Sequence, residues 1–560
     1  MNTGKARKLF ALLIVFWLLW PPAAKAADVQ GPANAGRVEK DRQQLILPPA
    51  MPEMQVPEMP DIDAPEGTEQ ITFVLNHVQF EGVTVFDHQQ LEQLYKEYLG
   101  TEVTLSTAWK IANALTQQYR ENGYFLSRAY VPLQEIEYGI VKIQAVEGYV
   151  DNVDYDDKTI ERSRIIDDII NSLMAERPLK QQTVENNLLL LNDLPGLSFR
   201  AIFQESKNPQ TPGAVNLLIV PAHEDGNGFL SFDNYGSRFL GPFEATASYQ
   251  YDFIPQQETT ITVIGAQPIS ELQYIGISQK APIFKNFSII AMASFTKAEP
   301  GYNLEFLDVE SESTNLGIVL EYDAIRQRDE NLTFKLSLDG KNTNTDIVDT
   351  ALTRDRVRAL RFSSTWDIND DWDGRNYANV TFSHGLDILS ASQRGEFTNS
   401  RFQAAPDFRK IEYYVSRTQA ITPDWGAVFA SSGQYSPDTL FSSEEFGYGG
   451  QNFGRAYDSS EITGDKGVAA SVELRFFGLS PYDILSFVPY TFYDIGKVWN
   501  NDTGSVGISG SSAGIGVRLQ SELGLAGNLS VAKPLTKPAS APQSSDAKNP
   551  RYLLQFMYIF

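Results

Sequence analysis

Residues 551–560, RYLLQFMYIF, end the chain and decide its fold. Their alternate side chains are apolar or aromatic, namely Tyr552, Leu554, Phe556, Tyr558 and Phe560. A period of two places these side chains on one face of a β-strand. At the edge of a soluble sheet such a face would cause aggregation. In a transmembrane barrel the same face meets lipid, and its aromatic rings form a girdle at the membrane surface. The last strand therefore predicts a membrane-spanning β-barrel.

The same alternation continues back from this end to about residue 224. In residues 244–253 polar side chains alternate with Ala245, Ala247, Tyr249, Tyr251 and Phe253. Apolar side chains outside and polar side chains inside are typical of a transmembrane barrel. At roughly 20 residues per strand with its connection, residues 224–560 allow about 16 strands. We therefore expect an all-β barrel of about 16 antiparallel strands. A soluble β-sandwich would also alternate, but both ends of the chain argue against it.

The first 26 residues have the pattern of a signal peptide. Lys5, Arg7 and Lys8 form a positive region, an apolar run follows from residue 9 to 20, and Ala24-Lys25-Ala26 gives the small-x-small cleavage pattern. The alternative is a membrane anchor, but the apolar run is shorter than the ~20 residues that a spanning helix needs. We therefore expect the mature chain to begin at Ala27.

Two further segments precede the first folded domain. Within residues 27–47, residues 34–47 (NAGRVEKDRQQLIL) could form a helix that is polar on nearly all sides, which suits a wet pore better than a packed core. We interpret this helix as a plug, with a disordered tail as the alternative. Residues 48–70 form a proline-rich linker, because six prolines occur between Pro48 and Pro65.

Residues 71–149 and 150–223 form two similar α+β units. Each shows a β-α-α-β-β order, at a period of about 75 residues. The similarity is one of order and length rather than of identity.

The composition excludes several function classes. The net charge is −24, which argues against a nucleic-acid partner. There is no cysteine, so thiolate chemistry and cysteine-type zinc sites are excluded. The sequence has no P-loop. The histidines are scattered without metal-ligand spacing, at His77, His88, His223 and His384. We therefore expect no enzyme activity, no cofactor and no metal site.

Four stretches carry a resemblance to a known family. They are residues 123–148 (GYFLSRAYVPLQEIEYGIVKIQAVEG), 191–222 (LNDLPGLSFRAIFQESKNPQTPGAVNLLIVPA), 449–476 (GGQNFGRAYDSSEITGDKGVAASVELRF) and 488–499 (VPYTFYDIGKVW). They resemble, in turn, the ends of two POTRA domains, a long inward-folded loop with the strand after it, and the strand on which that loop docks. All four occur in the two-partner secretion transporters, the TpsB or haemolysin-activator (ShlB/FhaC) type, a branch of the BamA-like outer-membrane superfamily.

The resemblance implies a location, a function and partners. It implies a pore in the outer membrane of a Gram-negative bacterium, with POTRA domains at residues 71–149 and 150–223 in the periplasm and a lumenal loop near 447–467. Such a pore exports a large TpsA-type exoprotein, adhesin-like or haemolysin-like, without ATP. Outer-membrane lipid, the barrel-assembly machinery and periplasmic chaperones are implied as further partners. The residues implied as the assembly signal of the last strand are Tyr552, Phe556, Tyr558 and Phe560.

Two rival functions stay open from the sequence. A BamA-like assembly factor would usually carry more POTRA domains, and its loss would deplete many barrels rather than one exoprotein. A passive solute porin would lack POTRA domains.

One ion pair is predicted inside the barrel. The family usually has Val-Arg-Gly-aromatic in its loop, whereas residues 454–457 here are Gly-Arg-Ala-Tyr, which keeps only the arginine and the aromatic residue. Asp494 interrupts an otherwise apolar, aromatic strand. A carboxylate that faces the lumen from such a strand needs a cationic partner, and the planar guanidinium of arginine can bind both carboxylate oxygens. We therefore predict a loop lock formed by Arg455, Tyr457, Phe492, Asp494 and Gly496, with a solvated loop arginine at position 455 as the alternative. Exchanging the two charges should then restore part of the function.

The POTRA domains are expected to bind the exported chain by strand addition. We predict residues 125–131 and 140–146 as the edge strands. The candidate cargo-binding residues are Phe125, Ser127, Ala129, Val131, Ile140, Lys142 and Gln144.

Overall fold

The computed structural model describes residues 35–37, 54–55, 62–155, 163–208, 210–224, 226–482, 485–501, 506–539 and 548–560. The predicted signal peptide lies outside these residues, as do most of the predicted plug helix and most of the linker. The chain divides into two compact units, one formed mainly by residues 49–224 and the other by residues 1–48 with the rest of the chain. Each unit is described by itself.

The first α+β unit, predicted as a POTRA domain and referred to by that name below, is built on a three-stranded sheet in the order β3-β6-β5. Asp87 begins the first helix with a capping box, because its side chain accepts from the Gln90 N–H while the Gln90 side chain accepts from the Asp87 N–H. The longer helix buries Leu115 and Tyr119 in the core. The elements are β2 (Thr72–Val74), β3 (His77–Glu81), α4 (His88–Gln93), β4 (Glu102–Thr104), α5 (Ser106–Glu121), β5 (Arg128–Tyr130) and β6 (Ile140–Val146), with 3-10 helices η1 (Thr68–Gln70) and η2 (Lys96–Tyr98).

The second α+β unit, predicted as a POTRA domain and called the second domain, has a four-stranded sheet in the order β1-β8-β9-β7. Its helix α6 buries Ile166, Ile169, Ile170 and Leu173, which recur at helical spacing on one face. The strand β1 comes from the linker and pairs in parallel with β8. The elements are β1 (Met54–Gln55), β7 (Tyr149–Tyr155), α6 (Arg164–Ala175), α7 (Gln181–Asn192), β8 (Leu197–Glu205) and β9 (Ala214–His223).

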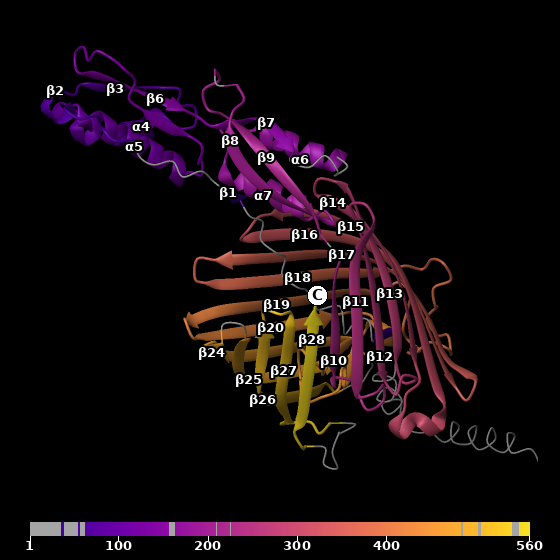
Figure 1. Ribbon diagram of the computed structural model, residues 1–560. Helices are drawn as coiled ribbons and strands as arrows, with labels where there is room; N and C mark the ends of the chain where they lie inside the picture. The colour runs from indigo at the N-terminus through magenta and orange to yellow at the C-terminus, as the bar shows by residue number, and fades with distance from the viewer. Residues whose placement is uncertain are drawn as a thin grey trace, which may run out of the picture. The chain divides into compact units, whose positions relative to one another are not determined.

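The remaining strands form a closed antiparallel barrel, drawn in magenta to yellow in Figure 1. The predicted barrel of about 16 strands is confirmed, and the short β24 is an extra piece paired with β25. The first half of the wall is β10 (Asn227–Asp233), β11 (Phe243–Ile254), β12 (Gln257–Gln267), β13 (Gln273–Phe284), β14 (Phe287–Ala298), β15 (Val309–Arg326), β16 (Glu330–Ile347) and β17 (Thr350–Asp370), with η3 (Tyr302–Leu307) between β14 and β15. The second half is β18 (Gly374–Gly385), β19 (Arg409–Thr422), β20 (Trp425–Tyr435), β23 (Lys466–Phe476), β24 (Leu479–Tyr482), β25 (Leu485–Trp499), β26 (Ile508–Ser521), β27 (Leu525–Pro534) and β28 (Arg551–Ile559).

The last strand closes the barrel against the first. Strand β28 pairs with β10 from Phe229↔Ile559 to Asp233↔Gln555, and the backbones of Gly228 and Phe560 exchange two hydrogen bonds. The outward side chains of the last strand are exposed at Tyr552, Phe556, Tyr558 and Phe560. Such a face suits lipid contact. Among the described residues, no helix combines the length and the apolarity that crossing a bilayer requires.

Candidate functional site: a loop held inside the barrel

The connection between β20 and β23, residues 436–465, folds among the inward faces of the barrel strands. We call it the lumenal loop. It contains η4 (Ser442–Glu444) and the strand pair β21 (Phe446–Tyr448) and β22 (Ile462–Gly464). Its aromatic side chains are buried against wall residues Ala469 and Val498. The loop therefore occupies the lumen as a packed element rather than lying over the rim.

Arg455 at the tip of this loop contacts Asp494 on β25 through a planar fork. Arg455 Nη2 donates to Asp494 Oδ1 at 2.9 Å, and Arg455 Nε donates to Asp494 Oδ2 at 3.1 Å. The backbone N–H groups of Gly454 and Arg455 also donate to Asp494 Oδ2, at 3.2 and 3.0 Å. The Asp494 side chain is 0% exposed, and the Arg455 side chain is 9% exposed. The structure thus brings together the two residues that the sequence predicts as partners.

The wall supplies further partners for both charges. Arg455 Nη1 donates to Glu473 Oε2 at 2.7 Å, and Arg455 Nη2 donates to the Ser471 hydroxyl at 2.9 Å. The guanidinium carbon lies 3.6 Å from the centre of the Phe492 ring, in cation–π geometry. The hydroxyls of Ser471 and Ser512 complete the shell around Asp494, at 2.8 and 3.2 Å. A charged pair so enclosed is stabilised by these extra bonds, which offset part of the cost of removing it from water.

The predicted Tyr457 and Gly496 flank the ion pair: Tyr457 acts through hydrogen bonds of its hydroxyl, and Gly496 acts through close packing. The Tyr457 hydroxyl donates to the carbonyl of Ser511 at 3.0 Å or to that of Lys537 at 2.8 Å. Gly496 lies under the ring of Tyr448, because a Cβ at residue 496 would come within 2.2 Å of Tyr448 Cδ2. Sequence reasoning missed Tyr448, although it is an aromatic residue directly before the loop glycines.

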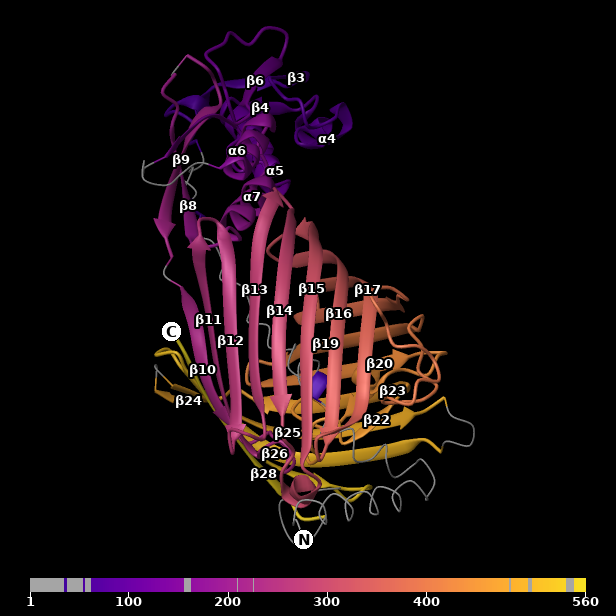
Figure 2. The ribbon, with the colours of Figure 1, turned by 90° about the vertical axis from the view of Figure 1, so that its right-hand side faces the viewer.

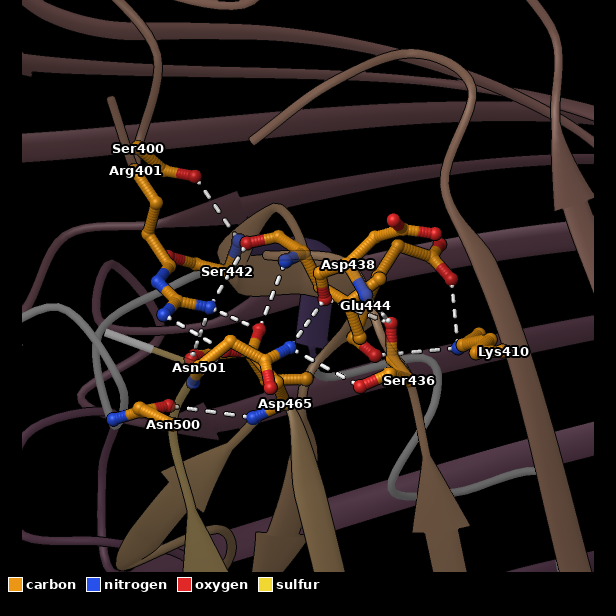
Figure 3. A network of polar contacts seen from close by, with 12 residues as sticks. Ser400, Arg401, Lys410, Ser436, Asp438, Ser442, Glu444, Asp465, Asn500 and Asn501 are labelled. Carbon is orange, nitrogen blue, oxygen red and sulfur yellow. Dashed lines mark hydrogen bonds and ion pairs between the residues drawn. The ribbon is translucent and has the colours of Figure 1, made fainter. Parts of the chain in front are cut away.

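A second anchor lies at the start of the loop, and the sequence analysis missed it. Lys410 Nζ on β19 lies 2.8 Å from Glu444 Oε2, and Arg361 Nη2 on β17 donates to Glu444 Oε1 at 2.9 Å. Figure 3 shows Glu444 and Lys410 in this network, together with the pair Arg401–Asp465 at the end of the loop. The adjacent acidic residues Glu444 and Glu445, which follow Leu440-Phe441-Ser442-Ser443, were the signal available in the sequence.

The only described part of the predicted plug helix, residues 35–37, is helical and buried in the barrel unit. Arg37 Nη1 donates to the carbonyl of Ser442 at 2.8 Å and lies 3.5 Å from Glu445 Oε2. Lys341 Nζ on β16 donates to the carbonyl of Gly36 at 3.1 Å. This segment therefore contacts both the lumenal loop and the wall.

The structure corrects the predicted POTRA edge strands. Strand β6, with Ile140, Lys142 and Gln144, is the central strand of its sheet and not an edge, since β3 and β5 pair with its two sides. Beyond the end of β5, the Gln134 side chain exchanges two hydrogen bonds of 2.7 Å with the Lys142 backbone. These backbone groups are therefore already satisfied. Strand order depends on distant pairing, which a local pattern does not report.

Strand β5 does lie at an edge, but its backbone is partly occupied. The Ala129 N–H donates to the Thr116 hydroxyl of α5 at 2.9 Å. Ser127 and Ala129 are buried, and Phe125 packs against Phe203 of the second domain at a ring distance of 5.2 Å. Val131 is partly buried in the first core. These four predicted residues thus face cores rather than an incoming strand.

One buried hydroxyl stabilises the first POTRA domain. Tyr119 on α5 donates to Glu147 Oε1 at 2.9 Å. Burial, followed by this hydrogen bond, raises the pKa of the Tyr119 hydroxyl well above its usual range. The folded domain therefore stabilises the neutral hydroxyl of Tyr119 over its phenolate form.

The comparisons with known proteins agree with this architecture. A model of the POTRA domain, ShlB-type, matches residues 73–148, and a model of the haemolysin secretion/activation protein ShlB/FhaC/HecB matches residues 283–517, which together make more than half of the chain. The chain belongs to this family of two-partner secretion transporters. It is 26% identical over 464 residues to the heme/hemopexin transporter protein HuxB of Haemophilus influenzae, covering 80% of each chain.

Solved structures share the fold of this family member. CdiB from Escherichia coli matches with a TM-score of 0.68 and 15% identity, over 100% of this chain and 99% of that chain. BamA from Haemophilus ducreyi, without its POTRA domains 1–3, matches with a TM-score of 0.53 and 13% identity, over 87% of this chain and 100% of that chain. These structures show the fold, and membership of the family shows the role: the chain is an outer-membrane pore that exports a partner exoprotein, with its POTRA domains in the periplasm.

Proposed function

We propose that the partner crosses the barrel lumen as an extended chain, and that the lumenal loop must leave its docked position to let it pass. The observation that carries this proposal is the packed loop itself, held by the pair Arg455–Asp494 and by Glu444. A folded exoprotein would not fit beside it. The sequence has no P-loop, the motif that would bind a nucleotide. The free energy for transport therefore comes from folding of the partner outside the cell.

Co-expression with a large exoprotein, sought in the neighbouring open reading frame, tests this function. In a host without such transporters, the exoprotein should reach the medium or cell surface only when this chain is present. Levels of other outer-membrane barrels should stay unchanged. A periplasmic exoprotein, or a broad loss of other barrels on depletion of this chain, would favour a different activity. Sugar-driven swelling of liposomes without any effect on the exoprotein would indicate a porin.

Strand addition in the POTRA region is proposed at β3 (His77–Glu81). Among the described residues this strand pairs only with β6, so its other side is open. The β8 edge of the second domain is occupied by β1 of the linker. Backbone pairing tolerates many cargo sequences, which suits an unfolded substrate.

Photo-crosslinking during export separates β3 from the other surfaces. A crosslinking residue at Gln79, exposed on β3, should capture the exoprotein. The matched control is Gln117, which is exposed on α5 of the same domain. Equal capture at both positions, or none at position 79 while export continues, would contradict strand addition at β3. Deleting residues 71–222 should leave an assembled barrel that does not export.

The segment 34–47 is proposed as a resting plug. Its described residues 35–37 lie against the lumenal loop and β16, through Arg37 and Lys341. Removing residues 27–65 should raise single-channel conductance while leaving most export intact. Unchanged conductance would favour the disordered-tail interpretation.

A further inference from the structure

Strand β17 carries three arginines at a period of two near its start. In this strand the odd-numbered residues from 353 to 361 face the lumen, since Asp355, Val357 and Ala359 are buried and Arg361 contacts the lumenal loop. The even-numbered Leu360 and Phe362 are exposed on the outside. Arg354, Arg356 and Arg358 therefore project from the outer wall, about 7 Å apart along the strand. We call them the arginine ladder.

The ladder lies against the polar part of β16. Register pairs Arg354 with Asn344, Arg356 with Asn342, and Arg358 with Gly340. A Cβ at residue 340 would come within 3.2 Å of Arg358 Cδ, so this glycine lets the arginine stem lie flat on the wall. Figure 2 shows β15, β16 and β17 side by side along this part of the barrel. The ladder is thus a preformed surface rather than three mobile side chains.

The hydrogen bonds of the ladder leave donors available. Arg356 Nη1 donates to Asn344 Oδ1 at 2.9 Å and to the carbonyl of Asp355 at 3.1 Å. Among the described residues, no acceptor receives the N–H groups of Arg356 Nη2 or Nε. The Nη1 and Nη2 groups of Arg358 donate only to neutral acceptors, and one of these bonds runs from Nη2 to Asn342 Oδ1 at 2.9 Å.

The charges of the ladder are not balanced by the protein. Asp346 pairs with Arg354, and within the described part of the chain neither Arg356 nor Arg358 forms an ion pair with a carboxylate. Asp355 is on the same strand and interacts electrostatically with Arg356, but its side chain is buried on the lumenal face and bonds to Ser400. Three arginines and one paired carboxylate leave an excess of two positive charges on this outward face, in a chain whose net charge is −24.

Two other outward cations of the same barrel have carboxylate partners. Arg417, near the end of β19, bonds to Asp370. Lys297 Nζ on β14 lies 3.0 Å from Glu299 Oε1 and 2.6 Å from Glu310 Oε1. Arg356 and Arg358 differ from these two positions because, among the described residues, they have no carboxylate partner, and the unused donors of Arg356 point to an anion from outside the protein.

Chain connectivity places the ladder in the outer leaflet. Strand β10 begins directly after the periplasmic domains, and the strands then alternate in direction, so β17 begins at the outer rim. The ladder precedes Leu360 and Phe362, which pair with the exposed Leu338 and Leu336 of β16. Charged groups therefore stand directly above an apolar wall. This matches an amphiphile with an anionic head and acyl chains, and it faces away from the exported chain in the lumen.

We propose that the arginine ladder binds the phosphate groups of a phosphorylated glycolipid of the outer leaflet. The planar fork of arginine binds phosphate oxygens through two parallel N–H groups. Arg356 supplies the donors that the protein leaves unused, while Arg354 and Arg358 add charge on either side. The acyl chains of the same lipid lie along Leu360 and Phe362. The site fixes one lipid to the wall beside the strands that hold Glu444 and the lumenal loop.

Binding to the full-length protein in detergent tests the site. The probes are bisphosphorylated lipid A, the same lipid without its phosphates, and inorganic phosphate as a competitor, with bound lipid counted by native mass spectrometry. Wild type should retain lipid A and should bind the dephosphorylated lipid at least about tenfold more weakly, as loss of a charge-assisted bond implies. Millimolar inorganic phosphate should not displace lipid A, because it offers no acyl chains. Displacement of lipid A by inorganic phosphate would show that the site binds free phosphate, and it would overturn the proposal of a lipid ligand.

Variants give the matched comparison. Replacing all three ladder arginines by glutamine should weaken lipid A binding by more than tenfold, and Arg356→Gln alone by about tenfold. Arg356→Lys should recover only part, because a lysine lacks the fork. Arg417→Gln removes an outward cation at the other end of the wall and should bind as wild type. Heat-modifiable migration in gels verifies that each barrel is folded, and the single variants decide the question if the triple variant is not. Equal lipid A binding by wild type and Arg356→Gln would overturn the proposal.

Discussion

Arg455→Ala should release the lumenal loop without preventing barrel assembly. The substitution removes the hydrogen bonds of Nε and Nη2 to Asp494, of Nη1 to Glu473, and of Nη2 to Ser471. Breaking a buried ion pair by removing one partner typically costs ~3–5 kcal/mol, because the other charge is left without its partner.

The groups that still contact Asp494 in the Arg455→Ala variant determine how much free energy the substitution costs within this range. Without the arginine side chain, Asp494 still accepts from two backbone N–H groups of the loop and from the hydroxyls of Ser471 and Ser512. Glu473 keeps two other arginines. We therefore expect the low end, about 3 kcal/mol. That corresponds to a shift on the order of a hundredfold in the equilibrium between docked and undocked loop.

Protease added to intact cells measures this shift through cleavage within residues 436–465, and export of the exoprotein is measured in the same cells. Arg455→Lys should give intermediate protection, because it keeps the charge but not the fork. The matched control is Arg475→Ala, whose guanidinium bonds to Glu473 and, among the described residues, to no part of the loop. Wild-type protection in Arg455→Ala, with strictly additive effects of Arg455→Ala and Asp494→Asn on thermal stability, would refute the lock.

Three further predictions concern single positions. Gly496→Ala should displace the Tyr448 ring, because the added Cβ would come within 2.2 Å of it, and loop protection from protease should fall; Gly527→Ala, where the nearest atom is 3.5 Å away, is the control and should behave as wild type. Because burial and a carboxylate partner raise the folded-state pKa of Tyr119, its contribution to stability is present below its unfolded pKa of about 10 and is lost as pH rises above it. Hydrogen exchange of residues 106–121 should therefore speed up above that pH in wild type and less so in Tyr119→Phe. Leu173→Ala removes a fully buried side chain and should destabilise the second domain by about 2–5 kcal/mol, seen as faster exchange in residues 164–205 with unchanged heat-modifiable migration of the barrel.

The barrel could be predicted from the sequence because its signal is local. The outward side chains of the last strand contact lipid and not another part of the protein. Their apolar character therefore appears in the sequence as a period of two from Tyr552 to Phe560. The same locality made Asp494 conspicuous, since a carboxylate within an aromatic strand needs a cation. Arg455 then followed from the family pattern, although 39 residues separate the two.

The parts that the sequence did not reveal depend on distant pairing. Strand β6 looks like any exposed strand, and its central position follows only from β3 and β5 lying on its two sides. The second anchor joins Glu444 to Arg361, which lies 83 positions earlier in the chain, and to Lys410, which lies 34 positions earlier. Each of these cations sits in an ordinary alternating strand, so no local pattern distinguishes them from a solvated lumenal charge.

The same distant environment changes what a charge exchange should do. From the sequence, Arg455→Asp combined with Asp494→Arg should restore part of the function, because the pair alone is symmetric. In the structure it is not: position 494 is surrounded by donors, including the Gly454 N–H and the Ser512 hydroxyl, whereas position 455 faces the carboxylate of Glu473. The exchange would place a guanidinium among N–H groups and a second carboxylate beside the first, and like charges so close repel. We therefore expect the double exchange to export no better than either single variant. Partial recovery of export would show that the loop re-docks in another position, with the wall around Asp494 free to rearrange.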